Sequence, residues 1–334
     1  MAGAGMKAIK TRISSVNSTK QITNAMHLVA SSKLRRAKQA AEESSEYFNT
    51  MYETIVEISL NTRGVNNEFL NSRKLEKRCH IVIAGDRGLA GGYNSNAFKE
   101  AKKYMGLVSD YVIPVGKKAV DHFTKSSDVE VIDKIESVEK CEYDKVKEIA
   151  EKVMQMFLDG EVDEVLLTYT QFHSALSQEA RTIKVLPLVF DQPLEYGREK
   201  DKEEIPLDDP DVFVSEEMIR KIEEEKEREE KRKQEELEKV NKLKGKKFKS
   251  RLQYLPSPQA VLEYLIPTYI SGTIYGGIVE SYASEQGARR TAMESATDNA
   301  NEMIKKLELS YNRARQSAVT QEITEISAGV EALK

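Results

Sequence analysis

The stretch Ile278–Leu333, IVESYASEQGARRTAMESATDNANEMIKKLELSYNRARQSAVTQEITEISAGVEAL, decides the fold. It contains no proline, and its glycines are Gly287 and Gly329. A helix over this stretch would be ~84 Å long, more than twice the roughly 30 Å width of a small domain. Most of such a helix is therefore predicted to project beyond any compact part of the chain.

Apolar residues near the end of this stretch follow a heptad spacing. They are Val319, Ile323, Ile326, Val330 and Leu333, and the residues between them are mostly Thr, Gln, Glu, Ser and Ala. So narrow an apolar stripe suits one partner helix rather than a broad core. The pattern predicts that the stripe packs against a single helix, with small or polar side chains on the other faces.

The helical pattern extends upstream to about Ser257. Four residues near its start, Pro267, Gly272, Gly276 and Gly277, are predicted to interrupt it, since proline and glycine weaken a helix interior. The C-terminal shaft helix is therefore assigned to 257–334.

The N-terminal part, 1–62, predicts a second long helix. From Lys7 to Leu60 there is neither Gly nor Pro, and small or apolar residues recur at steps of three and four. This helix would be ~75 Å long, and the segment NTRGVNNEF at 61–69 ends it. Two helices of such length cannot both fold back onto a small domain, so an antiparallel coiled coil is predicted.

Between the helices, 76–195 predicts a Rossmann-like α/β domain. Strands are expected at CHIVIAG, DYVIPVG, VEVIDKI, VDEVLLTYTQF and ARTIKVLPLVF, and helices after the glycine-rich turn, near Lys117–Thr124 and at Tyr143–Leu158. Alternating strands and helices indicate a mostly parallel sheet. The short link between the last two strands, at His173–Glu179, suggests an antiparallel edge.

A charged insertion occupies 196–246. Ser215–Lys244 holds eleven acidic and ten basic residues without Gly or Pro, and opposite charges recur at i,i+4. Such a pattern supports a solvated helical arm. A disordered insert explains the same composition.

The sequence carries few signs of catalysis or of a cofactor. In GDRGLAGG, counted from Gly85, Ala90 stands where a Walker loop needs its second glycine, so the glycines are interpreted as a strand-to-helix turn. The histidines, His27, His80, His122 and His173, have no metal-site spacing and are expected at surfaces or boundaries. No cofactor, no metal and no membrane-inserted segment is expected.

The first 41 residues carry an unbalanced positive charge. They hold eight basic residues and no acid: Lys7, Lys10, Arg12, Lys20, Lys33, Arg35, Arg36 and Lys38. Such a run needs an acidic partner nearby, because like charges repel one another. Nucleic acid is one conceivable partner, but no aromatic residues interleave with the run as base stacking would require.

The two ends resemble the gamma-subunit family of rotary F-type ATP synthases. The similarity lies in MKAIKTRISSVNSTKQITNAMHLVASSKLRRAK and ASEQGARRTAMESATDNANEMIKKLELSYNRARQSAVTQEITEISAG, and GDRGLAGGYN is similar to that family's turn after its first strand. The resemblance implies a non-catalytic central rotor inside a ring of alpha and beta subunits. It also implies that the α/β domain sits with the epsilon subunit on the membrane c-ring, peripherally on the cytoplasmic face of a bacterial plasma membrane.

The resemblance also implies which residues touch the stator. Within ARQSAVTQE it points to Arg315, Gln316, Thr320 and Glu322 as polar contacts to a beta-subunit loop. Near TNAMHLVA it points to Met26, Lys33, Arg35 and Arg36, beside an acidic loop of the same subunit. The charged insertion departs from the usual bacterial pattern, and its expected role is an arm that hinders rotation in one direction, or a solubilising segment.

Two other functions stay open on sequence alone. One is an independent α/β nucleotide-binding enzyme with coiled-coil oligomerisation arms, and the other is a coiled-coil scaffold that docks nucleic acid. Tight one-to-one binding of ATP or NAD would favour the enzyme, and salt-sensitive binding of generic DNA would favour the scaffold.

Overall fold

The computed structural model describes residues 2–61, 67–106, 108–126, 129–188, 254–255 and 257–332, so the insertion at 196–246 lies outside the described residues. The chain divides into two units, Met1–Leu188 with Leu262–Lys334, and Val189–Val261. The architecture below is that of the first unit, together with the first turn of its last helix.

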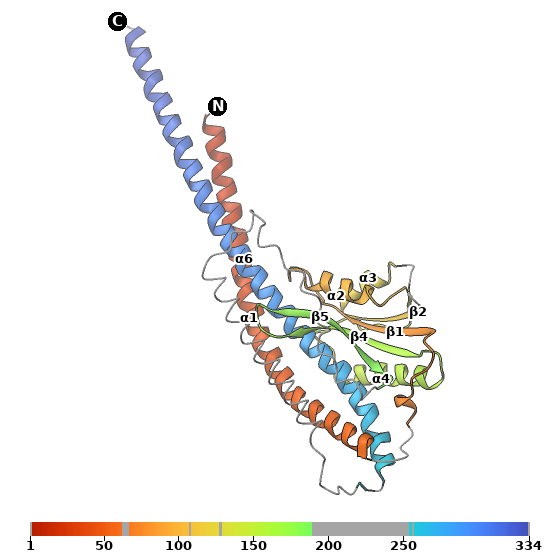
Figure 1. Cartoon of the computed structure of the whole chain (residues 1–334). Coiled ribbons are helices and arrows are strands. Elements are labelled where there is room, and N and C mark those ends of the chain that lie inside the picture. The colour runs from red at the N-terminus through yellow and green to blue at the C-terminus, as the bar shows by residue number, and fades with distance from the viewer. Residues whose placement is uncertain are drawn as a thin grey trace, which may run out of the picture. The chain divides into compact units, whose positions relative to one another are not determined.

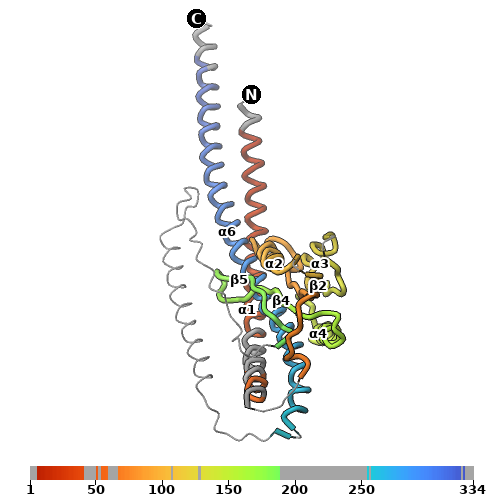
Figure 2. Tube along the Cα trace, turned by 45° about the vertical axis from the view of Figure 1, so that its right-hand side comes forward, coloured from red at the N-terminus to blue at the C-terminus, as the bar shows by residue number. Residues whose placement is uncertain are grey.

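Two long helices dominate the fold and confirm the predicted coiled coil. Helix α1 spans Ala2–Asn61 and helix α6 spans Pro258–Ala332. They run side by side in opposite directions, with both chain ends pointing the same way (Figures 1 and 2). The Thr23 and Thr297 hydroxyls lie 2.7 Å apart, and His27 faces Glu294 at 4.0 Å. Facing residues thus have numbers that add up to about 320, as an antiparallel pair requires.

Small and apolar side chains form the contact line between the helices. The inward positions are half-buried at a heptad spacing; on α1 they are Ile9, Ile13 and Val16, and on α6 they are Ile304, Leu307, Tyr311, Ala314 and Ala318. Nearer the sheet, Leu34 and Ala37 pack on Ala283. This line of half-buried residues is the seam that holds two helices together.

Helix α6 is continuous where an interruption was predicted. Pro267 lies inside it, and the three glycines that follow also remain helical. The reason is tertiary: Leu262, Ile266, Ile270 and Ile274 are fully or almost fully buried, and this burial outweighs the poor helix propensity of proline and glycine. At Gly277 a Cβ would lie 3.0 Å from Leu167 and 3.5 Å from Ile83, so glycine lets α6 approach the sheet closely.

The sheet has five strands in the order β3-β2-β1-β4-β5. Their bounds are β1 Lys77–Ile83, β2 Ser109–Val115, β3 Glu130–Val131, β4 Glu164–Phe172 and β5 Gln178–Leu186. The first four strands are parallel and β5 pairs antiparallel with β4, as predicted. The third strand is shorter than VEVIDKI suggests, since it ends at Val131 and only Ile135 rejoins the sheet, through a bridge to Val115.

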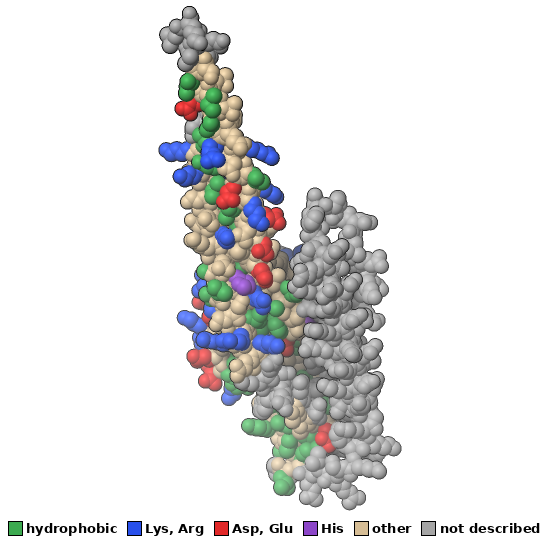
Figure 3. All heavy atoms as spheres, turned by 90° about the vertical axis from the view of Figure 1, so that its left-hand side faces the viewer, with side chains coloured by type: hydrophobic (Ala, Val, Ile, Leu, Met, Phe, Trp, Pro, Cys, Tyr) green, Lys and Arg blue, Asp and Glu red, His purple; other side chains and the backbone are tan. Residues whose placement is uncertain are grey.

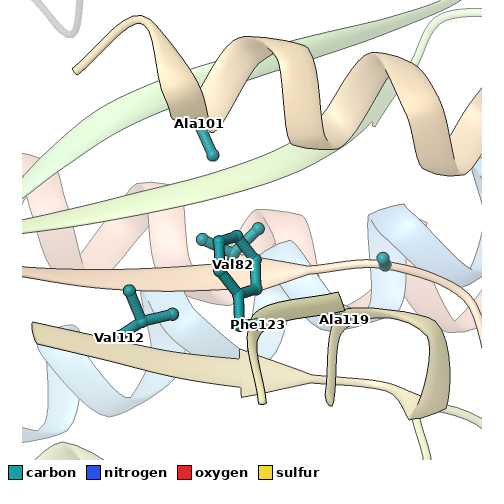
Figure 4. Packing of buried hydrophobic residues seen from close by; sticks show 6 residues of the cluster. Val82, Ala101, Val112, Ala119 and Phe123 are labelled. Atoms are coloured by element: carbon teal, nitrogen blue, oxygen red, sulfur yellow. The ribbon is translucent and has the colours of Figure 1, made fainter. Parts of the chain in front are cut away.

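Helices cover both faces of the sheet. Helix α2, Tyr93–Lys102, and helix α3, Lys117–Phe123, cover one face, where Val82, Ala101, Val112, Ala119 and Phe123 form a cluster (Figure 4). Helix α4, Tyr143–Leu158, and α6 lie on the other face, where the rings of Tyr143 and Tyr275 meet edge to face. A short 3-10 helix, η1 Glu68–Leu70, precedes β1. The sheet is therefore built directly onto α6.

One histidine is buried, contrary to the expectation from sequence. His80 lies in the central strand β1, and its Nε2 is 2.9 Å from Asp110 on β2; the two side chains are 0% and 3% exposed. Burial lowers the pKa of His80, so the neutral ring donates to the carboxylate. Beside it, Arg78 and Lys184 both contact the Glu164 carboxylate at 2.6 Å. The pairing of these charges explains how a central strand tolerates polar residues.

Candidate functional site

The projecting end of α6 carries the first group of predicted contact residues. Arg315, Gln316, Thr320 and Glu322 are all exposed. The Thr320 hydroxyl donates to the Gln316 carbonyl one turn earlier, at 2.9 Å. Lysine and arginine side chains point outward along the projecting part of the helix pair (Figure 3). These four side chains are thus available to another chain.

The apolar stripe near this end does not pack as predicted. Val319, Ile323 and Ile326 are 49%, 59% and 61% exposed, and the side chains of Val330 and Leu333 lie outside the described set. The contact line with α1 passes through Ala314 and Ala318 instead, one position away from Val319. Because the numbers of facing residues add up to about 320, Ala318 lies opposite Ala2, the first residue of α1. Helix α6 therefore extends beyond its partner helix. The stripe is an exposed surface.

The second predicted group lies on α1 near the sheet. Arg35 and Arg36 are exposed, as a stator contact requires. Met26 is half-buried and lines a cavity of about 310 Å³ between α1, the glycine-rich turn and α6. Lys33 lines the same cavity and forms an ion pair with Glu139, in the segment between β3 and α4. The structure therefore brings Lys33 to the chain's own α/β domain.

Two carboxylates occupy the glycine-rich turn. A Cβ on Gly85 would lie 2.7 Å from the carboxyl carbon of Glu285, which reaches in from α6 and pairs with Arg289. Asp86 accepts hydrogen bonds from the Ser137 hydroxyl at 2.7 Å and from the Val138 amide at 2.9 Å. Negative groups at these positions would repel a phosphate. The glycines form a strand-to-helix turn, as predicted. Gly91 has a φ of 56°, in the left-handed region that favours glycine, just before α2.

Polar residues that the sequence reading missed fasten α6 to the sheet. The Thr170 amide donates to the Ser281 hydroxyl, and the Ser284 hydroxyl donates to the Thr170 carbonyl, both at 3.0 Å. The Tyr93 hydroxyl donates to the Ser281 carbonyl at 3.0 Å. The available signal was a pair of serines one turn apart, Ser281 and Ser284, next to Glu285.

A second missed residue is Glu280 on α6. Burial raises the pKa of its carboxyl to about 7, and the charges of Arg181 and His173 oppose that shift. Its Oε2 is buried without a hydrogen-bond partner. Nothing in its spacing distinguishes it from the many surface glutamates of the chain.

The described residues meet neither the requirements of a metal site nor those of a membrane-spanning helix. Within them, no group of His, Cys, Asp and Glu side chains has a geometry that could hold a metal ion. Nor does any helix in the described ranges combine the length and apolar character that crossing a membrane requires.

Known proteins of one family match the chain over almost its whole length. The family model described as ATP synthase matches residues 5–333. The chain is 41% identical to the sodium-ion-specific ATP synthase gamma chain of Acetobacterium woodii, over 97% of both proteins. It is 40% identical to the ATP synthase gamma chain of Alkaliphilus metalliredigens, over 99% of this chain and all 100% of that protein.

A solved structure shows the same fold. A chain in the OSCP/F1/c-ring part of the Euglena gracilis mitochondrial ATP synthase, in rotational state 3, superposes with a TM-score of 0.58 at 18% identity. The match covers 99% of this chain and 95% of that chain. The long helix pair, the sheet built on α6 and these matches lead to one conclusion: the chain belongs to the family of ATP synthase gamma chains.

Proposed function

We propose that the chain is the central rotor subunit of an F-type ATP synthase. It transmits torque between a membrane c-ring and a hexamer of alpha and beta subunits, and it performs no catalysis itself. Its α/β domain sits with the epsilon subunit on the ring, peripherally on the cytoplasmic face of a bacterial plasma membrane. The support is the family membership together with the shape and surface of the helix pair.

The observation that carries the proposal is the contrast between the two parts of α6. Its first half is fixed to the sheet by burial and by hydrogen bonds from β4. Its second half leaves the sheet with α1 and then continues alone, with exposed side chains. A long helix that is fixed to a domain at one end and exposed at the other is suited to rotation inside a surrounding ring of subunits.

The surface chemistry of the bare end agrees with rotation. A rotor must pass three similar stator positions, and fully burying one large apolar side chain contributes ~1.5–3 kcal/mol. Several deep apolar contacts in one position would therefore trap it. Among the described side chains from Arg315 to Ser327 on α6, the large apolar groups are Val319, Ile323 and Ile326, and the rest are small, polar or charged.

The stator contacts are proposed at the exposed polar residues. Arg315 and Gln316, with Thr320 and Glu322, bind a beta-subunit loop in one rotational state. An Arg fork can grip a carboxylate in two parallel hydrogen bonds, which makes the contact depend on orientation. Arg35 and Arg36 face an acidic loop of the same subunit, with Met26 near them on the same helix, whereas Lys33 pairs with Glu139 of the chain's own α/β domain.

Reconstitution tests this proposal directly. Purified alpha and beta subunits of the same synthase are mixed with and without this chain, and steady-state ATP hydrolysis is measured. We expect a several-fold gain in turnover with the chain. No gain would refute the rotor function, and one-to-one binding of ATP or NAD to the isolated chain in calorimetry would favour the enzyme alternative.

A further inference from the structure

One ion pair joins α1 to the α/β domain at the level where the helices leave the sheet. Lys33 on α1 contacts the carboxylate of Glu139, which lies on the segment between β3 and α4. The two residues are 106 positions apart in the chain. The side chains are 34% and 38% exposed. The contact therefore spans two elements that the sequence gives no reason to pair.

Glu139 also reaches the second long helix. The Tyr282 hydroxyl of α6 hydrogen-bonds the Glu139 carboxylate, and the bonds from Lys33 and Tyr282 lower the pKa of that carboxyl. One carboxylate thus contacts α1 and α6 while it belongs to neither. The three residues Lys33, Glu139 and Tyr282 are called the neck cluster below.

The segment that carries Glu139 is held in place independently. Asp86, at the carboxyl end of β1, accepts hydrogen bonds from the Ser137 hydroxyl, the Val138 amide and, at 3.3 Å, the Glu139 amide. Because Asp86 follows a central strand, the sheet fixes the backbone on which Glu139 stands. The sheet thus holds the backbone at Glu139, and the partly exposed side chain reaches out from a fixed position.

At this level helix α1 packs on its neighbours mainly through small side chains. The side chains that it turns towards α6 are Thr23, Ala30, Leu34 and Ala37, and most of them are small. Small side chains allow close approach but interlock less than the large knobs of a regular coiled coil. Packing at this level therefore sets the rotation of α1 less sharply than a row of large knobs would, and a contact outside the helix pair can add to it.

We infer that the neck cluster orients α1 on the α/β domain, so that Lys33 and Glu139 fix the angular setting of the N-terminal helix relative to the sheet. Both are positioning residues in this role. The inference rests on the proposed rotor function and deepens it, since it names where the shaft is locked to the domain that the c-ring turns.

The cluster acts through geometry rather than through stability. An ion pair whose partners are more than a third exposed contributes little to the free energy of unfolding, because water screens it and the side chains lose entropy. It does act off the axis of the helix pair, where a small force resists rotation of α1. Reversing one charge replaces this restraint by repulsion, and reversing both restores it.

A charge-swap experiment tests the inference in the assembled complex of this chain with the other subunits of its own synthase. The variants are Lys33→Glu, Glu139→Lys and the double exchange, and the readout is ions pumped per ATP hydrolysed. A partly exposed ion pair shifts an equilibrium between two states by roughly two- to fivefold, and here the states are the native and the displaced setting of α1. Each single variant is expected to lower the pumping ratio by a similar factor. The double exchange should recover most of the wild-type ratio.

Arg36 supplies the matched control. It lies on the same helix and carries the same charge, but it is exposed. Arg36→Glu is combined with Glu139→Lys in the same way. If Lys33 acted on the stator instead of on Glu139, Lys33→Glu would behave like Arg36→Glu, and neither would be rescued by Glu139→Lys.

A distance measurement separates this outcome from any effect on catalysis. Spin labels are placed at Asn24 on α1 and Lys118 on α3, in a Cys141→Ser background, and the distance distribution is recorded by pulsed EPR. Lys33→Glu alone or Glu139→Lys alone should broaden the distance distribution, and the double exchange should narrow it again. Unchanged widths together with an unchanged pumping ratio would overturn the inference; a wild-type complex that pumps no ions would instead overturn the rotor function.

Discussion

At the scale of single residues, buried charge decides how α6 meets the sheet. Glu280, Glu285 and Arg289 lie on one helix within three turns, and they face β-strand residues or the glycine-rich turn. Burial raises the pKa of both carboxyls, while Arg289 lies beside Glu285 and opposes its shift. The sequence showed these residues as ordinary members of a charged helix, because burial is a property of the packed molecule.

Glu280 makes the stability of the fold depend on pH. The pKa of its carboxyl is about 7 in the folded chain, against an ordinary value of 4.5 for glutamate, because the group is buried. The folded state therefore binds the proton more tightly than the unfolded state does. This contribution to the free energy of unfolding is complete below pH ~4.5 and is lost as the pH rises through about 7, a decrease of up to roughly 3 kcal/mol. Glu280→Gln, which stays neutral, should raise Tm at pH 8 far more than at pH 5, as thermal melting will show.

Glu322→Gln is the control for this effect, because Glu322 is exposed on the projecting end of α6. It should leave the pH dependence of Tm unchanged. Equal shifts at pH 5 and pH 8 in the Glu280 variant would mean that its carboxyl does not titrate in this range.

Gly85 offers a second test of the charged contacts. An added methyl would meet the Glu285 carboxylate at 2.7 Å and displace it from its buried ion pair with Arg289, so Gly85→Ala is expected to destabilise the fold by about 1 kcal/mol. Gly88→Ala should cost far less, since nothing lies within 4 Å of its Cβ position. Denaturant unfolding of the two variants measures the difference, and equal costs would contradict the close approach of Glu285.

At the scale of elements, the sequence predicted what periodicity determines. The strands, their mostly parallel pairing and the bounds of α4 follow from alternation and three-four spacing, and the structure confirms them. Two features could not be read in this way. Helix α6 is continuous through Pro267 because the apolar side chains around it are buried, and the apolar stripe from Val319 is exposed because it lies beyond the first residue of α1. Both depend on how far a partner element reaches.

The serines of α6 provide the test at this scale. Ser281→Ala removes the acceptor of the buried Thr170 amide, and an unsatisfied buried donor costs about 1–3 kcal/mol. We expect that loss in the free energy of unfolding, with faster amide hydrogen exchange in β4. Ser317→Ala, at an exposed position on the same helix, should change neither quantity. A stability loss without faster exchange in β4 would place the effect elsewhere.

At the scale of the whole molecule, the helix pair divides its residues between two tasks. Those near the sheet hold α6 and α1 in place, whereas those near the end of α6 face outward. The predicted contact residues fall on both sides of this division: Arg315 and Gln316 are free of the sheet, and Lys33 is tied to Glu139. Sequence spacing could place all of them on helices, but not decide which partner each one meets.

Arg315→Ala tests the outward-facing group. Because Arg315 is exposed, its loss should change the free energy of unfolding of the chain by no more than about 0.5 kcal/mol. Coupled turnover of the assembled synthase should nevertheless fall several-fold, since a grip on the stator is lost. Parallel melting and ATP-synthesis assays distinguish the two effects, and a matched loss of stability and activity would argue for a structural role.

The most direct measurement follows the rotation of single molecules. The alpha and beta subunits are fixed to a surface, a bead is attached to the α/β domain of this chain at Lys118, and ATP is added. The account predicts that the bead turns in one direction, in three equal steps per revolution, as a threefold stator ring requires. Sustained ATP hydrolysis by the assembled complex with a stationary bead would contradict it.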